Sequence, residues 1–315
     1  MRGPDVAVPW ERRRIALVGG DERDPEIARL AAETGADVVA FGLPWPEGGI
    51  PGVALAASAK AAVQGAAYVF LPIPMGIGLH VYAPHADEPI VANRSLLSAM
   101  APGGHLFLGR ATPELREEAE ASGVELHEYD PDKELMLLRA PAIVEGAIQL
   151  AIEHTDVTIH DANVVVVGYG TIGSLLARRL RDLGARLHVA ARNPIQRAAA
   201  HADGARTHAL EELRDLAPTL QMVFSTVPAR VVDRAVLERL PPRSLVLDIA
   251  PPPDHADLDA AAELGHRAVW ARGLGRRAPI TVGASQWMGL RRMIEEIEHA
   301  RAGATPSDLN KAVAR

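Results

Sequence analysis

Blocks of apolar residues alternate with glycine turns and amphipathic stretches along most of the chain. Residues 164–167 are four consecutive valines, and a short β-branched run without a polar position predicts a strand buried on both faces. After the glycine turn that follows, apolar residues recur at helical spacing from Ile172 to Leu183. Because strand and helix keep alternating on both sides of this stretch, the pattern predicts doubly wound parallel sheets.

Two sets of such elements are expected, separated by one long apolar helix. Strands are predicted at 15–18, 37–41, 68–71, 105–108, 124–127, 164–167, 185–191, 222–226, 245–249 and 268–270. Helices are predicted at 26–33, 93–100, 113–122, 135–154, 210–213, 231–240, 258–264 and 284–300. The fold class is therefore α/β, with a flavodoxin-like N-terminal domain, a Rossmann domain and a cleft between them.

The length of 315 residues fits two domains of roughly 150 residues each. The helix at 135–154, interrupted near its start by Pro141, is expected to link them, and the last helix to return to the first domain. We expect an N-terminal substrate domain over 1–139, completed by the helix 284–302. An NADP-binding domain is expected over 140–283, and the composition of 303–315 is typical of a flexible tail.

Three glycines after the valine run fit the fingerprint of a dinucleotide site. Gly168 permits the tight turn, Gly170 lets the backbone approach a pyrophosphate, and Gly173 lets the helix pack closely on the strand. The phosphates would lie against the free N–H groups at the start of the helix. The cofactor-binding residues expected here are Gly168, Tyr169, Gly170, Thr171, Ile172 and Gly173.

The end of the second Rossmann strand indicates which dinucleotide is bound. No Asp or Glu occurs from Leu183 to Ala202, although NAD enzymes usually place a carboxylate there for the ribose 2′-hydroxyl. Arg192, Asn193 and Arg197 follow the strand instead, and a guanidinium can bind a 2′-phosphate through paired hydrogen bonds. The sequence therefore favours NADP; the alternative is that both arginines are solvated surface charges.

Composition narrows the class of protein further. A hydrophobic share of 48% with 23% charged residues is typical of a well-packed globular protein, and a net charge of −7 argues against a general affinity for nucleic acid or acidic membranes. The absence of cysteine excludes disulfides and thiolate sites. No apolar run approaches about 18 residues and no signal peptide is evident, so a cytoplasmic protein is expected.

Several segments resemble the A-subunit family of dipicolinate synthase. They are Ile15–Asp21 with Arg23, Val144–Ile148, Ala151–Asp156, Thr158–His160 and the turn Gly168–Gly173. The segment 144–160 is the more specific marker, because glycine turns are widely shared. The architecture is also similar to that of 2-hydroxyacid dehydrogenases and adenosylhomocysteinase.

The resemblance implies an NADP-dependent oxidoreductase of the sporulation pathway that oxidises dihydrodipicolinate to dipicolinate and has a flavoprotein partner, the B subunit. Two segments depart from the family pattern. The loop after the third strand reads Pro72-Ile73-Pro74-Met75 where small, hydroxyl-bearing residues are expected, and Pro251-Pro252-Pro253 stands where the family tends to Arg-Pro-Gly. Both segments are expected to border the cleft, so they affect the substrate more than the fold.

A dicarboxylate substrate calls for arginines or helix N-termini. Arg23 and Arg110 both follow strands of the first domain and are expected to bind substrate together with Asp21, Arg23 being also a candidate catalytic residue. Arginines of the second domain that are candidates for the same role are Arg230, Arg272, Arg276 and Arg277. For each of them, the ordinary alternative is a solvated surface residue.

Oxidation to an aromatic ring also needs a group that accepts a proton. Glu145 on the linking helix is the leading candidate, followed by His154; the alternative for Glu145 is a hinge salt bridge. Thr226, Val227 and Pro228, after Ser225, are expected beside the nicotinamide ribose, and Gly273–Gly275 with Pro279 beside the nicotinamide amide. His80 and His85 lie on the long loop 72–85, but no metal is expected, because no further ligand cluster accompanies them.

The sequence thus predicts a homo-oligomeric NADP-dependent oxidoreductase acting on a small cyclic dicarboxylate. Two alternatives stay open. One is an NADP-linked dehydrogenase for another imino or hydroxy acid, which the altered loops would permit. The other is a regulatory protein that binds NADP without turnover, because no unmistakable acid–base pair is visible.

Overall fold

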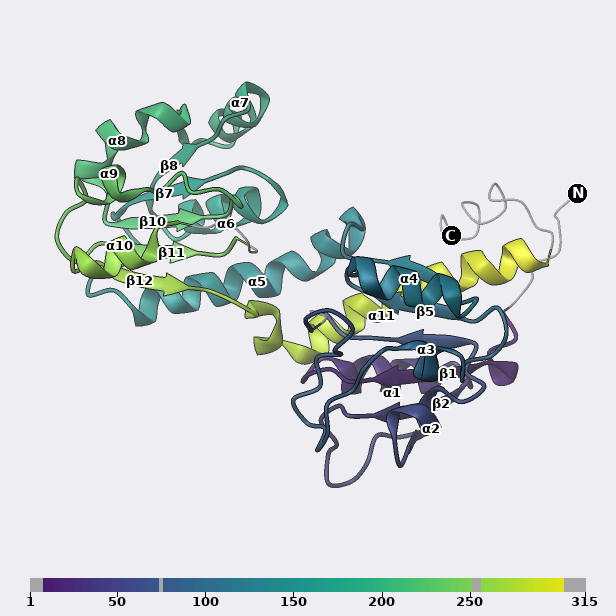
Figure 1. Ribbon diagram of the computed structural model, residues 1–315. Helices are drawn as coiled ribbons and strands as arrows, with labels where there is room; N and C mark the ends of the chain where they lie inside the picture. The colour runs from purple at the N-terminus through teal and green to yellow at the C-terminus, as the bar shows by residue number, and fades with distance from the viewer. Residues whose placement is uncertain (1–7, 74–75, 251–255, 303–315) are drawn as a thin grey trace, which may run out of the picture. The chain divides into compact units, whose positions relative to one another are not determined.

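The computed structural model describes residues 8–73, 76–250 and 256–302. The chain forms two compact units: the first takes the residues up to Arg139 together with those from Ala278 onward, and the second runs from Ala140 to Arg277 (Figure 1). Each unit contains one six-stranded parallel sheet with helices on both faces, so the predicted α/β class with two doubly wound sheets is confirmed.

The sheet of the first unit has the order β3-β2-β1-β4-β5-β6. Its strands are β1 (Arg14–Val18), β2 (Asp37–Phe41), β3 (Val53–Leu55), β4 (Tyr68–Phe70), β5 (His105–Leu108) and β6 (Glu125–Glu128). Without β3, this order is that of flavodoxin-like folds. The short strand β3 adds a sixth member beside β2.

Side chains of β1 alternate between two hydrophobic cores. Ile15 and Leu17 join the core under α1 (Asp24–Glu33) and α11 (Pro279–Arg301). Ala16 and Val18 join the core under the remaining helices, which are α2 (Ala59–Val63), α3 (Arg94–Leu97) and α4 (Pro113–Ala121). Because successive strand residues point to opposite faces, the near-continuous apolar run of β1 fills both cores at once.

The sheet of the second unit has the order β12-β11-β10-β7-β8-β9, which is the Rossmann order. Its strands are β7 (Asn163–Val167), β8 (Arg186–Ala190), β9 (Arg206–His208), β10 (Met222–Ser225), β11 (Leu245–Asp248) and β12 (Arg267–Trp270). Val167 pairs with Ala190 on one side and with Ser225 on the other. The carboxyl ends of these three strands therefore meet at one edge.

The valines of β7 alternate in the same way as the residues of β1. Val164 and Val166 face the core that includes α5 (Lys133–Glu153) and α6 (Thr171–Asp182), whereas Val165 and Val167 face the opposite core. Other helices of this unit are α7 (Pro194–Ala202), α8 (Leu213–Leu216), α9 (Arg234–Leu237) and α10 (Leu258–Glu263), with short 3-10 turns at Trp10–Arg12, Leu210–Glu212, Ala217–Thr219 and Leu274–Arg277.

Three details differ from the elements that the pattern predicted. The edge strands β3 and β9 were not predicted, because β3 is largely exposed and β9 consists of polar residues. Helices α3 and α9 are shorter than predicted, since Asn93 and Asp233 cap their first turns and each helix ends after four residues. Asp24, not Pro25, begins α1.

Helix α5 is long and apolar enough to cross a membrane by length and composition, with a mean hydropathy of 1.6, whereas the sequence pattern suggested no such run. Core helices satisfy the same criterion, and Val144, Ala147 and Ala151 of α5 are buried in the core of the second unit. The apolar character of α5 is therefore accounted for by packing. Of the two unusual proline segments, Pro74, Met75 and 251–253 lie outside the described residues.

Candidate functional site

The turn between β7 and α6 leaves no room for side chains at two of its three glycines. A Cβ on Gly168 would lie 2.6 Å from Oγ1 of Thr226, and Gly168 has a φ of +96°. A Cβ on Gly173 would lie 2.4 Å from the carbonyl oxygen of Gly168. At Gly170, by contrast, a Cβ would meet nothing within 4 Å, so the turn is open at the position expected to face a pyrophosphate.

The first turn of α6 offers donors toward that open space. Gly170 is the N-cap residue, and no side chain accepts a hydrogen bond from the first N–H groups of the helix. These N–H groups have no partner within the helix itself, and the positive end of the helix dipole favours an anion. The turn therefore fits the diphosphate of a dinucleotide.

Thr226 and Ser225 support the turn from the end of β10. Thr226 donates its hydroxyl to the carbonyl of Val167 at 2.9 Å, and its side chain lies against Gly168 and Gly173. The Ser225 hydroxyl is buried and has no hydrogen-bond partner among the described residues. Val227 contacts Gly168, whereas Pro228 is exposed.

Tyr169 supports the turn from within. Its ring is buried, and its hydroxyl donates to Oδ2 of Asp203 at 2.5 Å, an oxygen that also accepts from Arg178 at 3.2 Å. Burial together with the Asp203 carboxylate raises the pKa of Tyr169 to about 12. The side chain thus anchors the turn to the end of α7, and only its backbone faces the open side.

The three polar residues after β8 lie together but play different parts. Arg197 donates from Nη1 to the carbonyls of Ala191 and Arg192 at 2.7 and 2.9 Å. Asn193 caps α7 by accepting from the N–H of Ile195 at 2.8 Å. The Arg192 side chain is exposed and has no hydrogen bond or ion pair within the described part of the chain. Arg192 is therefore the guanidinium available for a phosphate.

In the first unit, the turn after β1 holds a buried ion pair. Nε and Nη2 of Arg23 each donate to an Asp21 carboxylate oxygen at 2.8 Å, and Nη2 also bonds to the carbonyl of Ile73. Burial opposes the charge of Arg23, but Asp21 outweighs it and keeps the pKa of Arg23 above its ordinary value. The charge expected to bind substrate is thus largely neutralised by Asp21.

Three buried polar residues beside this pair were not predicted as site residues. Burial raises the pKa of Asp24 to about 7, although its Oδ2 accepts from the N–H of Asp21 at 2.8 Å. Tyr129 shares a hydrogen bond with the Gln286 side chain, and Oε1 of Gln286 is buried without a partner among the described residues. An acidic residue at the start of a helix was visible in the sequence for Asp24, but no local pattern indicated Gln286, because it comes from α11.

The remaining candidate arginines have looser or different partners. Arg110 is exposed and lies 3.7 Å from Asp130, and Arg230 lies 4.0 Å from Asp257. The guanidinium of Arg272 stacks 4.6 Å from the Trp270 ring centroid. Arg276 lies against Gly273, and Arg277 pairs with Glu145.

The two candidate bases are placed very differently. Glu145 is exposed on α5, and Leu274, which follows β12, packs on the adjacent Gly146. Glu145 therefore lies near the carboxyl end of the sheet. His154 follows α5, two residues from Asp156, which pairs with Arg243 and Arg267 near the starts of β11 and β12. That location is the opposite edge of the sheet and argues against His154 as the base.

Comparison with known proteins then places the chain. The dipicolinate synthase A subunit of Bacillus subtilis (strain 168) is 30% identical over 290 residues, covering 90% of this chain and 97% of that protein. The chain belongs to the dipicolinate synthase A-subunit family. The resemblance predicted from the segments around 144–160 is thus confirmed. The N-terminal domain that defines the dipicolinate synthase A-subunit family matches residues 14–129.

Solved structures of the A-subunit family have the same fold. The crystal structure from Bacillus halodurans matches with a TM-score of 0.82 at 26% identity, covering 89% of this chain and 97% of that one. The structure from Bacillus subtilis matches with a TM-score of 0.82 at 28% identity, covering 91% and 97%. Two doubly wound sheets are therefore a property of the family.

The second unit also matches a broader class of proteins. Residues 143–269 match the NAD-binding domain of S-adenosyl-L-homocysteine hydrolase. That match includes the turn Gly168–Gly173 and the Arg192 loop. It indicates a nicotinamide dinucleotide as cofactor and an oxidoreductase type of function.

Proposed function

We propose that the protein oxidises dihydrodipicolinate to dipicolinate, with NADP⁺ as hydride acceptor, in the role of the A subunit of a dipicolinate synthase. The observation that carries this proposal is the similarity to the Bacillus subtilis protein, which extends over 97% of that protein. The open glycine turn and the uncapped start of α6 support the dinucleotide part of it.

The choice of NADP rests on the loop after β8. A 2′-phosphate needs a cation and no competing carboxylate. Arg192 is exposed and unpaired among the described residues, and no acidic residue occurs between 183 and 202. Arg197 supports this assignment indirectly, because its bonds to the carbonyls of Ala191 and Arg192 hold the loop that presents Arg192.

Oxidation of the dihydro ring removes one hydride and one proton. Bound NADP⁺ supplies the hydride acceptor, so the protein must position the ring and accept the proton. For the proton, we propose the Glu145 carboxylate, whose ion pair with Arg277 would have to open first. For a substrate carboxylate, Arg110 is the better candidate, because its partner Asp130 is 3.7 Å away whereas both Asp21 oxygens already engage Arg23.

A turnover assay with both coenzymes tests the function and the cofactor assignment together. Freshly generated dihydrodipicolinate is mixed with protein and NADP⁺ or NAD⁺, with and without a B subunit, and reduced coenzyme and dipicolinate are measured. We expect turnover with NADP⁺ preferred. Arg192→Asp should lower the preference for NADP⁺ over NAD⁺ by about tenfold or more, because a charge-assisted hydrogen bond is lost and repulsion is added.

Arg186→Asp is the matched control. Arg186 is an exposed arginine at the opposite end of the same strand, 3.4 Å from Asp161, so its replacement makes the same change of charge away from the proposed phosphate site. An unchanged coenzyme preference in Arg192→Asp would contradict the NADP assignment. Absence of turnover under all four conditions, with coenzyme still bound, would contradict the proposed reaction.

A further inference from the structure

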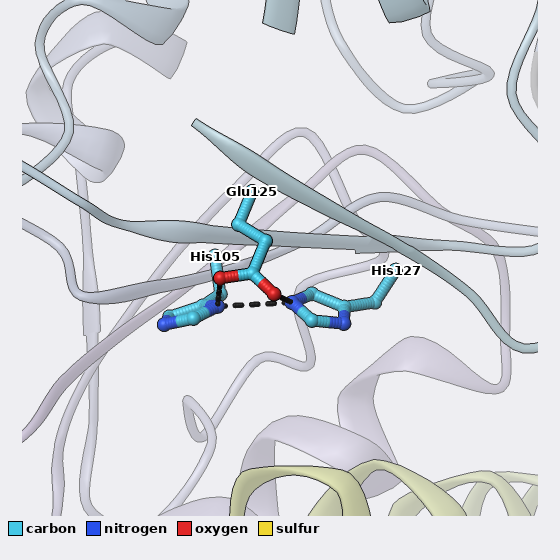
Figure 2. A group of neighbouring side chains, drawn as sticks. All are labelled: His105, Glu125 and His127. Atoms are coloured by element: carbon cyan, nitrogen blue, oxygen red, sulfur yellow. Dashed lines mark hydrogen bonds and ion pairs between the residues drawn. The ribbon is translucent and has the colours of Figure 1, made fainter. Parts of the chain in front are cut away.

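Two histidines and a glutamate converge at the edge of the first sheet. His105 begins β5 and pairs in register with Glu125, which begins the edge strand β6. His127 follows two residues later on β6 and therefore projects from the same face of the sheet as Glu125. Figure 2 shows the three side chains pointing toward one another. We call this group the β5–β6 cluster.

The spacing of the three ligand atoms matches one face of a metal coordination tetrahedron. Nδ1 of His105 lies 2.9 Å from Nε2 of His127, and these nitrogens lie 3.4 and 3.7 Å from the two Glu125 oxygens. Zinc bonds of 2.0–2.2 Å in tetrahedral geometry place neighbouring ligand atoms roughly 3.3 Å apart. A small cation can thus be accommodated by shifts of a few tenths of an ångström.

The ionisation states favour a cation. His105 is 3% exposed, and the side chain of His127 is 21% exposed. Burial lowers the pKa of His105 to about 4, with a further lowering by Arg301, and burial lowers the pKa of His127 as well. Both imidazoles are therefore neutral at physiological pH, as metal ligation requires.

Arg301 competes with a cation in this arrangement. Its Nη2 lies 2.8 Å from Nε2 of His105, so Nε2 accepts that hydrogen bond and Nδ1 carries the proton. Binding through Nδ1 requires the other tautomer, and Arg301 must then turn away from the ring. It has other acceptors within reach, because the Gly103 carbonyl and Oε1 of Glu298 each lie at 3.2 Å.

We propose that the β5–β6 cluster binds one Zn²⁺ or similar transition-metal ion through Nδ1 of His105, Nε2 of His127 and the Glu125 carboxylate. Glu125 is 66% exposed, so water completes the fourth position. The ion would tie the edge strand β6 to β5 at the amino ends of both strands. The cofactor turn belongs to the other unit, so this ion has a structural role.

The second unit contains a natural control for this site. Nδ1 of His188 on β8 lies 3.0 Å from Nε2 of His208 on β9, which repeats the pair of imidazoles. The carboxylate nearest to that pair, Glu212, lies 3.9 Å from the other ring nitrogen of His208. Two imidazoles without a converging carboxylate make a weaker site, so replacing His208 should leave binding at the β5–β6 cluster intact.

The experiment uses the full-length, tag-free protein after removal of metal by a chelator. Zn²⁺ is titrated by calorimetry, Co²⁺ binding is followed by the visible absorption of a tetrahedral site, and Tm is measured at each Zn²⁺ concentration. We expect one Zn²⁺ per chain and a Tm that rises with Zn²⁺. His127→Asn and Glu125→Gln should each weaken binding by about tenfold or more, whereas His208→Asn should not.

Arg301→Gln provides the sharpest variant, because it removes the competing charge without touching a ligand. We expect it to bind Zn²⁺ more tightly than the wild-type protein. Circular dichroism of every variant checks that it is folded, and the Co²⁺ spectrum is read on the folded ones. Failure of the wild-type chain to bind Zn²⁺ at one equivalent would overturn the proposal, as would equal binding by folded His127→Asn.

Discussion

At the scale of the residue, glycines of a single turn face different constraints. Gly173 is required by the fold itself, because a Cβ there would lie 2.4 Å from the backbone oxygen of Gly168. Gly170 has an ordinary φ of −83° and nothing within 4 Å of the position of a Cβ. The need for glycine at 170 therefore comes from a ligand and not from the fold.

Alanine at these two positions should separate binding from stability. Gly170→Ala should keep the Tm of the wild-type protein but weaken NADPH binding by about tenfold or more, because the methyl group enters the space for the pyrophosphate. Gly173→Ala should lower the free energy of unfolding by about 1–3 kcal/mol, since the turn must open to admit the methyl group. NADPH fluorescence titration and urea denaturation measure the two effects. Loss of stability in Gly170→Ala would contradict this division.

At the scale of the element, the turn between β1 and α1 combines a buried ion pair with a buried acid. Arg23 and Asp21 neutralise each other, which leaves Asp24 without a strong cation of its own. Asp24 is 8% exposed, and removal from water disfavours its charged form. The turn therefore keeps a protonated carboxyl group close to neutral pH.

This acid should make the first unit less stable as the pH rises. The unfolded carboxyl group ionises near 3.8 and the folded one near 7, so between these values the unfolded state loses a proton that the folded state retains. Stability from this group is present below about 4 and lost as the pH rises toward 7, by up to about 4 kcal/mol. Asp24→Asn, which can still accept from the N–H of Asp21, should lack this loss.

Urea denaturation of both proteins across this range measures the difference. Subtracting the variant from the wild-type protein removes the contributions of the other carboxyl groups. Glu22→Gln, which replaces an exposed carboxyl group of the same turn, is the control and should follow the wild-type curve. Parallel curves for the wild-type protein and Asp24→Asn would show that the buried carboxyl group does not titrate with a raised pKa.

The elements themselves were predictable where the pattern was strong. The valines of β7 and the apolar run of β1 are buried on both sides, and their periodicity was sufficient to identify them. Strands β3 and β9 lie at sheet edges and carry exposed or polar residues, so no hydrophobic period marks them. Side-chain pairing was not predictable: the sequence placed Arg23 and Asp21 in one turn, but their mutual neutralisation depends on burial.

At the scale of the whole molecule, the first unit is completed from the far end of the chain. Helix α11 packs along α1, and the approach is so close that a Cβ on Gly283 would lie 2.6 Å from the carbonyl of Arg23. Trp287, Leu290 and Ile294 enter the same core as Ile15. The apolar spacing of this helix was visible in the sequence, but its partners were not, because they are more than 250 residues away.

This return of the chain makes a prediction about Leu290. It is fully buried, so Leu290→Ala should lower the stability of the first unit by about 2–5 kcal/mol through lost burial and a cavity. Hydrogen exchange should then rise in β1, α1 and α11, which share that core, and stay unchanged in β7 and α6, with NADPH affinity retained. Met288→Ala, at an exposed position of the same helix, should alter neither. If exchange rose equally in β7, the two units would unfold as one, and the core of α11 would contribute to the stability of the entire molecule.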